Sequence, residues 1–296
     1  MSTATQSPIA SIVTLPDKRE TNTSRFWRAF RRNHIALVGL VVVGIMAFFA
    51  VFADVVAPYS PNEPHYTEVL NAPSAKYFLG TDELGRDIFS RLIYGARISL
   101  VIGFVAQSVA LTLGITIGLI SGWYSGWIDD LLMRLADIFF AIPGLMFLIV
   151  WITIFDASTI NIFLALGLIS WSGNARMMRS QVLGQKALEY VTAAQSLGAS
   201  VPRILFFHIL PNAIAPMIVL ASLGVAGAIL SEATLSFLGL GVQIPTPSWG
   251  TMVNNSGNYI TTAWWYAMYP GLTIMLTVLG FNFIGDGLRD ALLPSK

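Results

Sequence analysis

The sequence predicts an all-α integral membrane protein that crosses the membrane with six helices. Of its 296 residues, 55% are hydrophobic and 11% are charged, whereas soluble domains carry about 25% charged residues. Charge-free apolar runs recur along the chain, and about 20 such residues are needed to cross the hydrocarbon core of a bilayer. Lysines and arginines gather between alternate runs, which is typical of a membrane protein with a fixed orientation.

Six apolar segments are predicted to be transmembrane spans, at about residues 35–53, 98–122, 132–155, 160–175, 212–238 and 263–284. The stretch from Ala233 to Gly285 contains no charged residue and is too long for a single crossing. Pro245, Pro247 and the polar residues 254–258 interrupt it. The middle of this stretch is therefore predicted to be a loop between the last two spans.

The amino-terminal residues 1–34 are predicted to form a cytoplasmic tail and an interfacial lead-in to a transmembrane domain at 35–296. Residues 1–24 are rich in Ser, Thr and Pro and lack apolar periodicity, which is typical of a flexible segment. Four arginines and three aromatic residues then alternate: Arg25, Phe26, Trp27, Arg28, Phe30, Arg31 and Arg32. This mixture is typical of a helix at the surface of a membrane.

The distribution of basic residues predicts that both chain ends lie in the cytoplasm. With six spans, thirteen lysines and arginines fall on the side of the chain ends, and four fall on the opposite side (Lys76, Arg86, Arg91 and Arg97). Cytoplasmic loops carry the excess of basic residues in membrane proteins. The thirteen-to-four ratio therefore sets the predicted orientation.

Several classes of function are excluded by what the sequence lacks. It has no cysteine and only three histidines, none close to another in sequence. It also lacks a phosphate-binding G-x-x-x-x-G-K-[ST] loop, an H-E-x-x-H zinc pair and a G-x-S-x-G nucleophile elbow. We therefore expect neither catalytic residues nor a metal site. The net charge of +1 argues against a nucleic-acid partner.

The segment at about 176–211 is predicted to be a structured cytoplasmic loop. Residues 189–197 are typical of a short helix, and Gly198 can end it in the left-handed conformation. Pro202 suits the first turn of a second short helix that runs toward Pro211. Two short helices that meet at a glycine would form a compact projection suited to docking another protein.

This segment resembles the "EAA" loop of permeases in type I ABC importers, which contacts the ATP-hydrolysing subunit through a coupling helix. Thr192 stands where the motif has Glu, and His208 stands where it has Ile. The resemblance assigns the coupling role to Thr192, Ala193, Ala194, Ser196, Leu197, Gly198, Ala199, Pro202, His208, Leu210 and Pro211.

Three further segments resemble permeases of the peptide/opine/nickel class. They are residues 78–92, residues 235–250 and residues 281–291, which resemble the segment before span two, the loop after span five and the carboxy-terminal signature of that class. Together with the EAA-type loop, they cover the chain from about residue 78 to its end in the order of the family. The implied fold is the MetI-like permease fold of type I ABC importers.

The resemblance implies a permease subunit in a bacterial inner membrane that forms half of a translocation pathway for dipeptides or oligopeptides. Nickel, opines or glutathione are alternative substrates, and a secondary transporter or channel is a more distant alternative. The implied partners are membrane lipid, a homologous second permease, two ATP-binding subunits that hold ATP and Mg²⁺, and an extracytoplasmic substrate-binding protein. No cofactor is expected in this chain.

Two sites near the outer ends of spans are expected to be structural or to contact substrate. Glu232 lies near the outer end of the fifth span, and an ionisable group within a span is a candidate for function. Two interpretations stay open for Glu232. It contacts the substrate pathway, or it lies close enough to water at the membrane surface that its charge needs no functional explanation. Asp87 and Arg91 are four residues apart with the acid first, so we expect them to pair within a helix.

Overall fold

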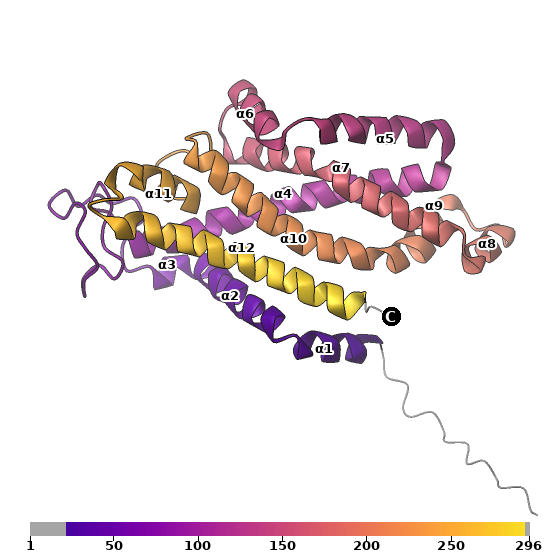
Figure 1. Cartoon of the computed structure of the whole chain (residues 1–296), viewed down its shortest axis with the longest axis horizontal. Coiled ribbons are helices and arrows are strands. Elements are labelled where there is room, and N and C mark those ends of the chain that lie inside the picture. Colours follow the sequence, from indigo (N-terminus) through magenta and orange to yellow (C-terminus); the bar gives the residue numbers. More distant parts are fainter. Residues whose placement is uncertain (1–21, 294–296) are drawn as a thin grey trace, which may run out of the picture.

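The computed structural model describes residues 22–293, which are mainly helical (Figure 1). In this part of the chain, extended pairing is limited to a single bridge between Thr81 and Asp87. The predicted flexible tail lies mainly in residues 1–21, outside the described residues. The all-α class predicted from the sequence is confirmed.

Long apolar helices form the body of the molecule. Four helical stretches are long and apolar enough to cross a membrane: α2 (His34–Val51), α4 (Ile88–Tyr124), Val201–Phe237, which contains α10 (Leu210–Phe237), and α12 (Trp264–Leu292). A fifth is the pair α5 (Gly126–Ala141) and α6 (Gly144–Phe155), if the two count as one broken span. The helix α7 (Thr159–Lys186) lies among them but is more polar.

The helices run back and forth along the long axis of the molecule (Figure 1). The short helices α1 (Asn22–Arg32) and α8 (Glu189–Ser196) lie at the same end as the carboxy terminus of α12. We call this the inner end. The helices α3 (Ala53–Val56) and α11 (Trp249–Ser256) lie at the opposite, outer end.

Small residues let α4 and α7 pack closely. A side chain added at Gly114, Gly118 or Gly122 of α4 would come within 2.4–2.7 Å of atoms of α7. The three glycines are four residues apart and therefore share one face of the helix. Such a face lets two helix backbones approach closely in a membrane.

The third predicted span is broken. Helices α5 and α6 meet at an angle of 90°. The predicted span at 132–155 therefore consists of two helices rather than one, because Pro143 imposes an extended backbone on Ile142, which ends α5. The helix that contains the second predicted span is also longer than expected, because it begins at Ile88 rather than Ile98.

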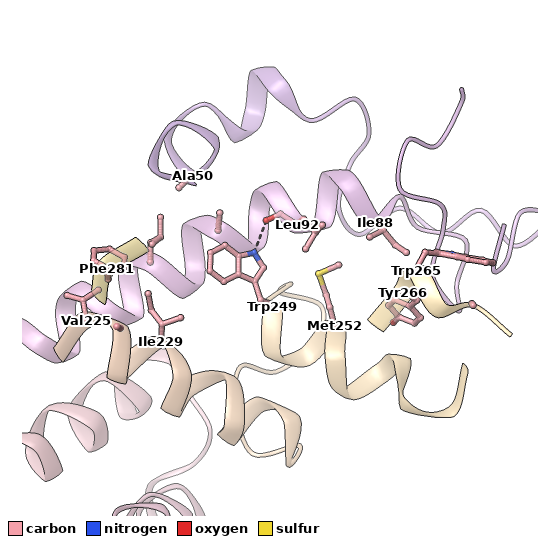
Figure 2. Packing of buried hydrophobic residues seen from close by; sticks show 14 residues of the cluster. Ala50, Ile88, Leu92, Val225, Ile229, Trp249, Met252, Trp265, Tyr266 and Phe281 are labelled. Atoms are coloured by element: carbon pink, nitrogen blue, oxygen red, sulfur yellow. Dashed lines mark hydrogen bonds between the residues drawn. The ribbon is translucent and has the colours of Figure 1, made fainter. Parts of the chain in front are cut away.

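The predicted loop between the last two spans contains a helix. Ser248 starts α11 with a reciprocal capping interaction with Thr251, in which the hydroxyl of Ser248 accepts from the Thr251 amide. Trp249 is fully buried between α4, α10 and α12, and its indole Nε1 donates to the carbonyl of Leu92 at 3.0 Å (Figure 2). The start of α11 is therefore packed between the long helices, and this segment does not simply lie over them as a loop.

A buried ionic cluster stabilises the outer segment that precedes α4. Arg86 Nε lies 2.6 Å from a carboxylate oxygen of Asp82, and Arg91 Nε lies 3.4 Å from the same oxygen. Arg91 also donates to the carbonyl of Pro61 at 2.7 Å. Asp87 instead caps α4 by accepting from the amide and hydroxyl of Ser90. The predicted Asp87–Arg91 pair is therefore wrong, because Asp87 precedes the helix and serves as its cap.

Candidate functional site

The segment predicted to couple to a partner contains two short helices and a π-helical turn. Helix α8 is followed by Gly198, then by α9 (Val201–Ile204) and a π-helical turn (Leu205–Ile209). The turn continues directly into α10. The predicted loop at 176–211 is thus shorter than expected: α7 extends to Lys186, and the second short helix is the first part of a continuous helix over 201–237.

Gly198 ends α8 in the way that the sequence predicts. Its φ of +77° is in the left-handed region, where glycine is favoured because it has no Cβ. The amide of Gly198 donates to the carbonyl of Gln195 at 2.9 Å, and the amide of Ala199 donates to the carbonyl of Ala194 at 3.1 Å. This pair of hydrogen bonds is a Schellman motif, which satisfies the last carbonyls of α8 and reverses the chain.

One side of the segment is anchored in the helical body. Val191, Ile204 and Ile209 are at most 1% exposed. They share a buried cluster with residues of α4 and α7, among them Trp123 and Met178. The position of α8 is therefore coupled to that of the long helices beneath it.

The other side of the segment exposes large apolar side chains. Leu197 is 88% exposed, Phe207 75% and Phe206 58%. A surface hollow of about 470 Å³ is lined by Pro202, Arg203, Phe206, Phe207 and His208. Neighbouring exposed apolar residues on a protein surface are typical of a site that binds another protein or the membrane.

The structure brings the predicted coupling residues together on this projection. The exposed ones are Thr192, Ala193, Ser196, Leu197, Gly198, Pro202 and Pro211, and the half-buried ones are Ala194, Ala199, His208 and Leu210. The sequence analysis missed Phe206 and Phe207 as surface residues. Their spacing gave no signal, because two adjacent apolar residues in a helix cannot be assigned to a face without the helix phase.

An ion pair and two further hydrogen bonds lie beside the segment. Arg179 of α7 donates from Nε to Asp129 of α5 at 2.6 Å, and Ser121 of α4 donates to the same carboxylate. Lys186 donates to the main-chain carbonyl of Trp123. These contacts join the inner ends of α4, α5 and α7.

Glu232 is fully buried at the outer end of α10. Ser236 donates to one of its carboxylate oxygens at 2.6 Å, and the hydroxyl of Ser99 lies 3.5 Å from the other. Ser231 and Thr234 line a cavity of about 450 Å³ between α6, α7 and α10, whereas Glu232 is not among its lining residues. In this conformation the carboxylate joins α10 to α4.

Among residues 22–293, no group of three His, Cys, Asp or Glu side chains has the geometry to hold a metal ion.

Residues 114–296 match the family described as binding-protein-dependent transport system inner membrane component. The chain belongs to this family of inner membrane permeases. Residues 21–73 additionally match the N-terminal transmembrane domain of oligopeptide transport permease C. The resemblance to ABC importer permeases is therefore confirmed, and this permease is a multi-pass membrane protein that acts as a transport subunit.

Two relatives match the permease over nearly its whole length. The dipeptide transport system permease protein of Escherichia coli strain K12 is 49% identical over 281 residues, which are 93% of each chain. The glutathione transport system permease protein of Shigella flexneri is 43% identical over 94% of this chain and 92% of its own.

A solved structure supports the fold. An inward-facing structure of the MetNI methionine ABC transporter aligns with a TM-score of 0.56 and 18% identity, covering 68% of this chain and 96% of that chain. The MetI-like fold predicted from the sequence is therefore confirmed.

Proposed function

We propose that this permease forms half of the translocation pathway of an ATP-driven importer for dipeptides or oligopeptides. The other half is a homologous permease, and two ATP-binding subunits dock beneath the pair and hold ATP and Mg²⁺. A substrate-binding protein delivers the peptide from outside the membrane. Both ends of the chain and α8 face the cytoplasm.

The observation that carries this proposal is the exposed apolar surface at the end of α8 and on the π-helical turn. Leu197, Phe206 and Phe207 face outward, while Val191 and Ile209 on the opposite side pack into the helical body. A partner that binds the exposed side can thereby move the long helices. This is the arrangement needed for a two-state gate that a partner biases from one end.

Peptides are the proposed substrates because of the 49% identity to a dipeptide permease over 93% of the chain. Glutathione is a second candidate, because a permease named for it is 43% identical. Glu232 contributes to the gate by joining α10 to α4 through Ser236 and Ser99.

The test is uptake of a radiolabelled dipeptide into proteoliposomes that contain the permease, its homologous partner and the ATP-binding subunits, with the binding protein added outside. We expect uptake only when ATP is present on the side of α8, and inhibition by unlabelled di- and tripeptides. Uptake by this chain alone, driven by an ion gradient, would overturn the proposal. Uptake of radiolabelled glutathione but not of the radiolabelled dipeptide by the same assembly would select the second candidate.

A further inference from the structure

Helix α1 is attached to the inner end of the molecule by its aromatic face. The ring of Phe30 is 5% exposed and packs against α12 beside Gly287, where an added side-chain carbon would lie 3.1 Å from the ring. Phe26 stacks on Phe30 with ring centroids 6.0 Å apart. Asn33, directly after α1, donates to Asp290 of α12 at 3.0 Å. These contacts fix the rotation of α1 about its axis.

The opposite face of α1 is basic. Arg25, Arg28, Arg31 and Arg32 are all exposed. At 3.6 residues per turn they fall within about one third of the helix circumference, on the side away from Phe30. The described helix has no acidic residue in its own sequence. The rotation fixed by the aromatic face therefore presents a continuous arginine surface to the surroundings.

The arginine surface lies next to the apolar belt of the protein. Helix α2 begins at His34, and its outward side chains Ile35 and Val38 are 59% and 57% exposed. Arg32 and Arg31 precede Ile35 by three and four residues, across the helix break at Asn33. The arginines therefore lie at the boundary of the apolar surface, where the headgroups of a bilayer would lie. The negative surface potential of a bilayer attracts basic residues within about a Debye length of its surface, about 8 Å at physiological ionic strength.

We propose that the arginine surface of α1 (Arg25, Arg28, Arg31 and Arg32) is a binding site for the phosphate headgroups of anionic phospholipids. A guanidinium group offers paired N–H donors that match phosphate oxygens. Trp27 lies at the edge of this surface and is 50% exposed, and tryptophan is enriched at the depth of lipid headgroups. The site enriches anionic lipid around α1 and fixes the depth of the inner end in the bilayer.

The absence of cysteine from the chain allows a direct test. His34, which is exposed at the junction of α1 and α2, is replaced by cysteine and labelled with a fluorophore in the full-length protein. The protein is placed in nanodiscs with equal mole fractions of spin-labelled phosphatidylglycerol or spin-labelled phosphatidylcholine. We expect stronger quenching by phosphatidylglycerol. The preference should fall about fivefold for each arginine replaced by glutamine, and a triple variant of Arg25, Arg31 and Arg32 should lose it.

Four comparisons decide between the alternatives. Arg134→Gln removes an exposed arginine from α5 and should leave the preference unchanged. Replacing the three arginines by lysine should lower the preference less than glutamine does, because the charge remains while the paired donors are lost. Equal quenching by the two lipids in the parent protein would overturn the proposal. So would loss of the preference in inorganic phosphate but not in potassium chloride of the same ionic strength, since the site would then bind free phosphate. The readout requires no transport, so it is independent of the proposed function.

Discussion

At the scale of single residues, Gly198 is required by its backbone conformation and not by close packing. It has a φ of +77°, and a side chain added there would meet no atom within 4 Å. Only the conformational preference of the backbone therefore requires glycine at this position. The sequence allowed this inference because a glycine between a short helical pattern and Pro202 is typical of a helix end.

Gly198→Val should abolish coupling without unfolding the protein. The left-handed conformation costs a non-glycine residue about 1–2 kcal/mol, so α8 should be reoriented while the long helices stay intact. We expect normal amounts in the membrane, loss of dipeptide uptake, and loss of the stimulation of ATP hydrolysis by loaded binding protein.

Gly184→Val is the matched control for this substitution. Gly184 lies in α7 near the same end and also has open space around it, but its backbone is helical. This variant should transport normally. If both valine variants transport at the parent rate, the turn at Gly198 does not position a coupling element.

Arg91→Ala should destabilise the outer segment strongly. Arg91 is 1% exposed, lies 3.4 Å from Asp82, which also pairs with Arg86, and donates to the carbonyl of Pro61. Its removal leaves that part-buried carbonyl without this donor and opens a cavity, and an unsatisfied buried polar group alone costs about 1–3 kcal/mol. The melting temperature of the purified protein should fall, and proteolysis between residues 57 and 87 should accelerate.

Lys76→Ala provides the comparison for Arg91→Ala within the same segment. Lys76 pairs with Glu68 at 2.6 Å, but its side chain is 58% exposed. Such a pair contributes about 0–1 kcal/mol, so this variant should be close to the parent. An equal loss of stability in both variants would contradict the structural role of the buried cluster.

At the scale of elements, the close contact between α4 and α7 depends on glycines. The sequence contains the signal, since Gly114, Gly118 and Gly122 recur every four residues. That spacing identifies a face suited to close packing, but it does not identify the helix that packs there. The partner depends on how the chain returns along α7, which is a tertiary property.

Gly118→Val should force α4 and α7 apart. An added Cβ would lie 2.6 Å from the carbonyl oxygen of Ala175, and a backbone atom in a helix cannot move aside. Overpacking costs about 1–3 kcal/mol or more, so we expect a lower melting temperature and reduced folded yield. Gly44→Val on α2, where no atom lies within 4 Å, should leave both measurements unchanged.

The break between α5 and α6 shows which part of an element composition can predict. The length and apolarity of residues 132–155 were sufficient to predict that they enter the membrane. Ile142 and Pro143 predict that the helix ends there, but they do not predict the 90° angle at which α6 leaves α5. Helix α11 was missed for a related reason: its eight residues are too short and too polar to show a spanning pattern.

At the scale of the whole molecule, most of the fold and the projecting segment after α7 could be predicted. The spans are predicted from the length of apolar segments, and the orientation from the distribution of charge. Both depend on many residues, so one residue that does not fit the pattern changes neither prediction. The burial of Glu232 could not be predicted, because it depends on packing against α4, far away in the sequence. The exposure of Phe206 and Phe207 depends on the phase of their helix, and the capping role of Asp87 depends on where α4 begins.

The orientation of the whole molecule can be tested with a reporter that is active only in the cytoplasm. Fusions after residues 60, 157, 195, 250 and 296 sample successive connections and the end of the chain. The thirteen-to-four distribution of basic residues predicts activity at 195 and 296 only. Activity after residue 250 would contradict six crossings, because α11 would then lie on the same side as α8.

Because the π-helical turn continues directly into α10, a tilt of the turn at the inner end would move the outer end of α10. Helix α10 has 28 residues, which is about 42 Å at 1.5 Å per residue. A tilt of about 5° at its inner end would sweep its outer end through about 4 Å. That end carries Glu232 and Ser236, and the hydroxyl of Ser236 lies 3.4 Å from that of Ser248 at the start of α11. If α11 moved with α10 while α4 stayed in place, a displacement of this size would break the hydrogen bond of 3.0 Å between Trp249 and Leu92.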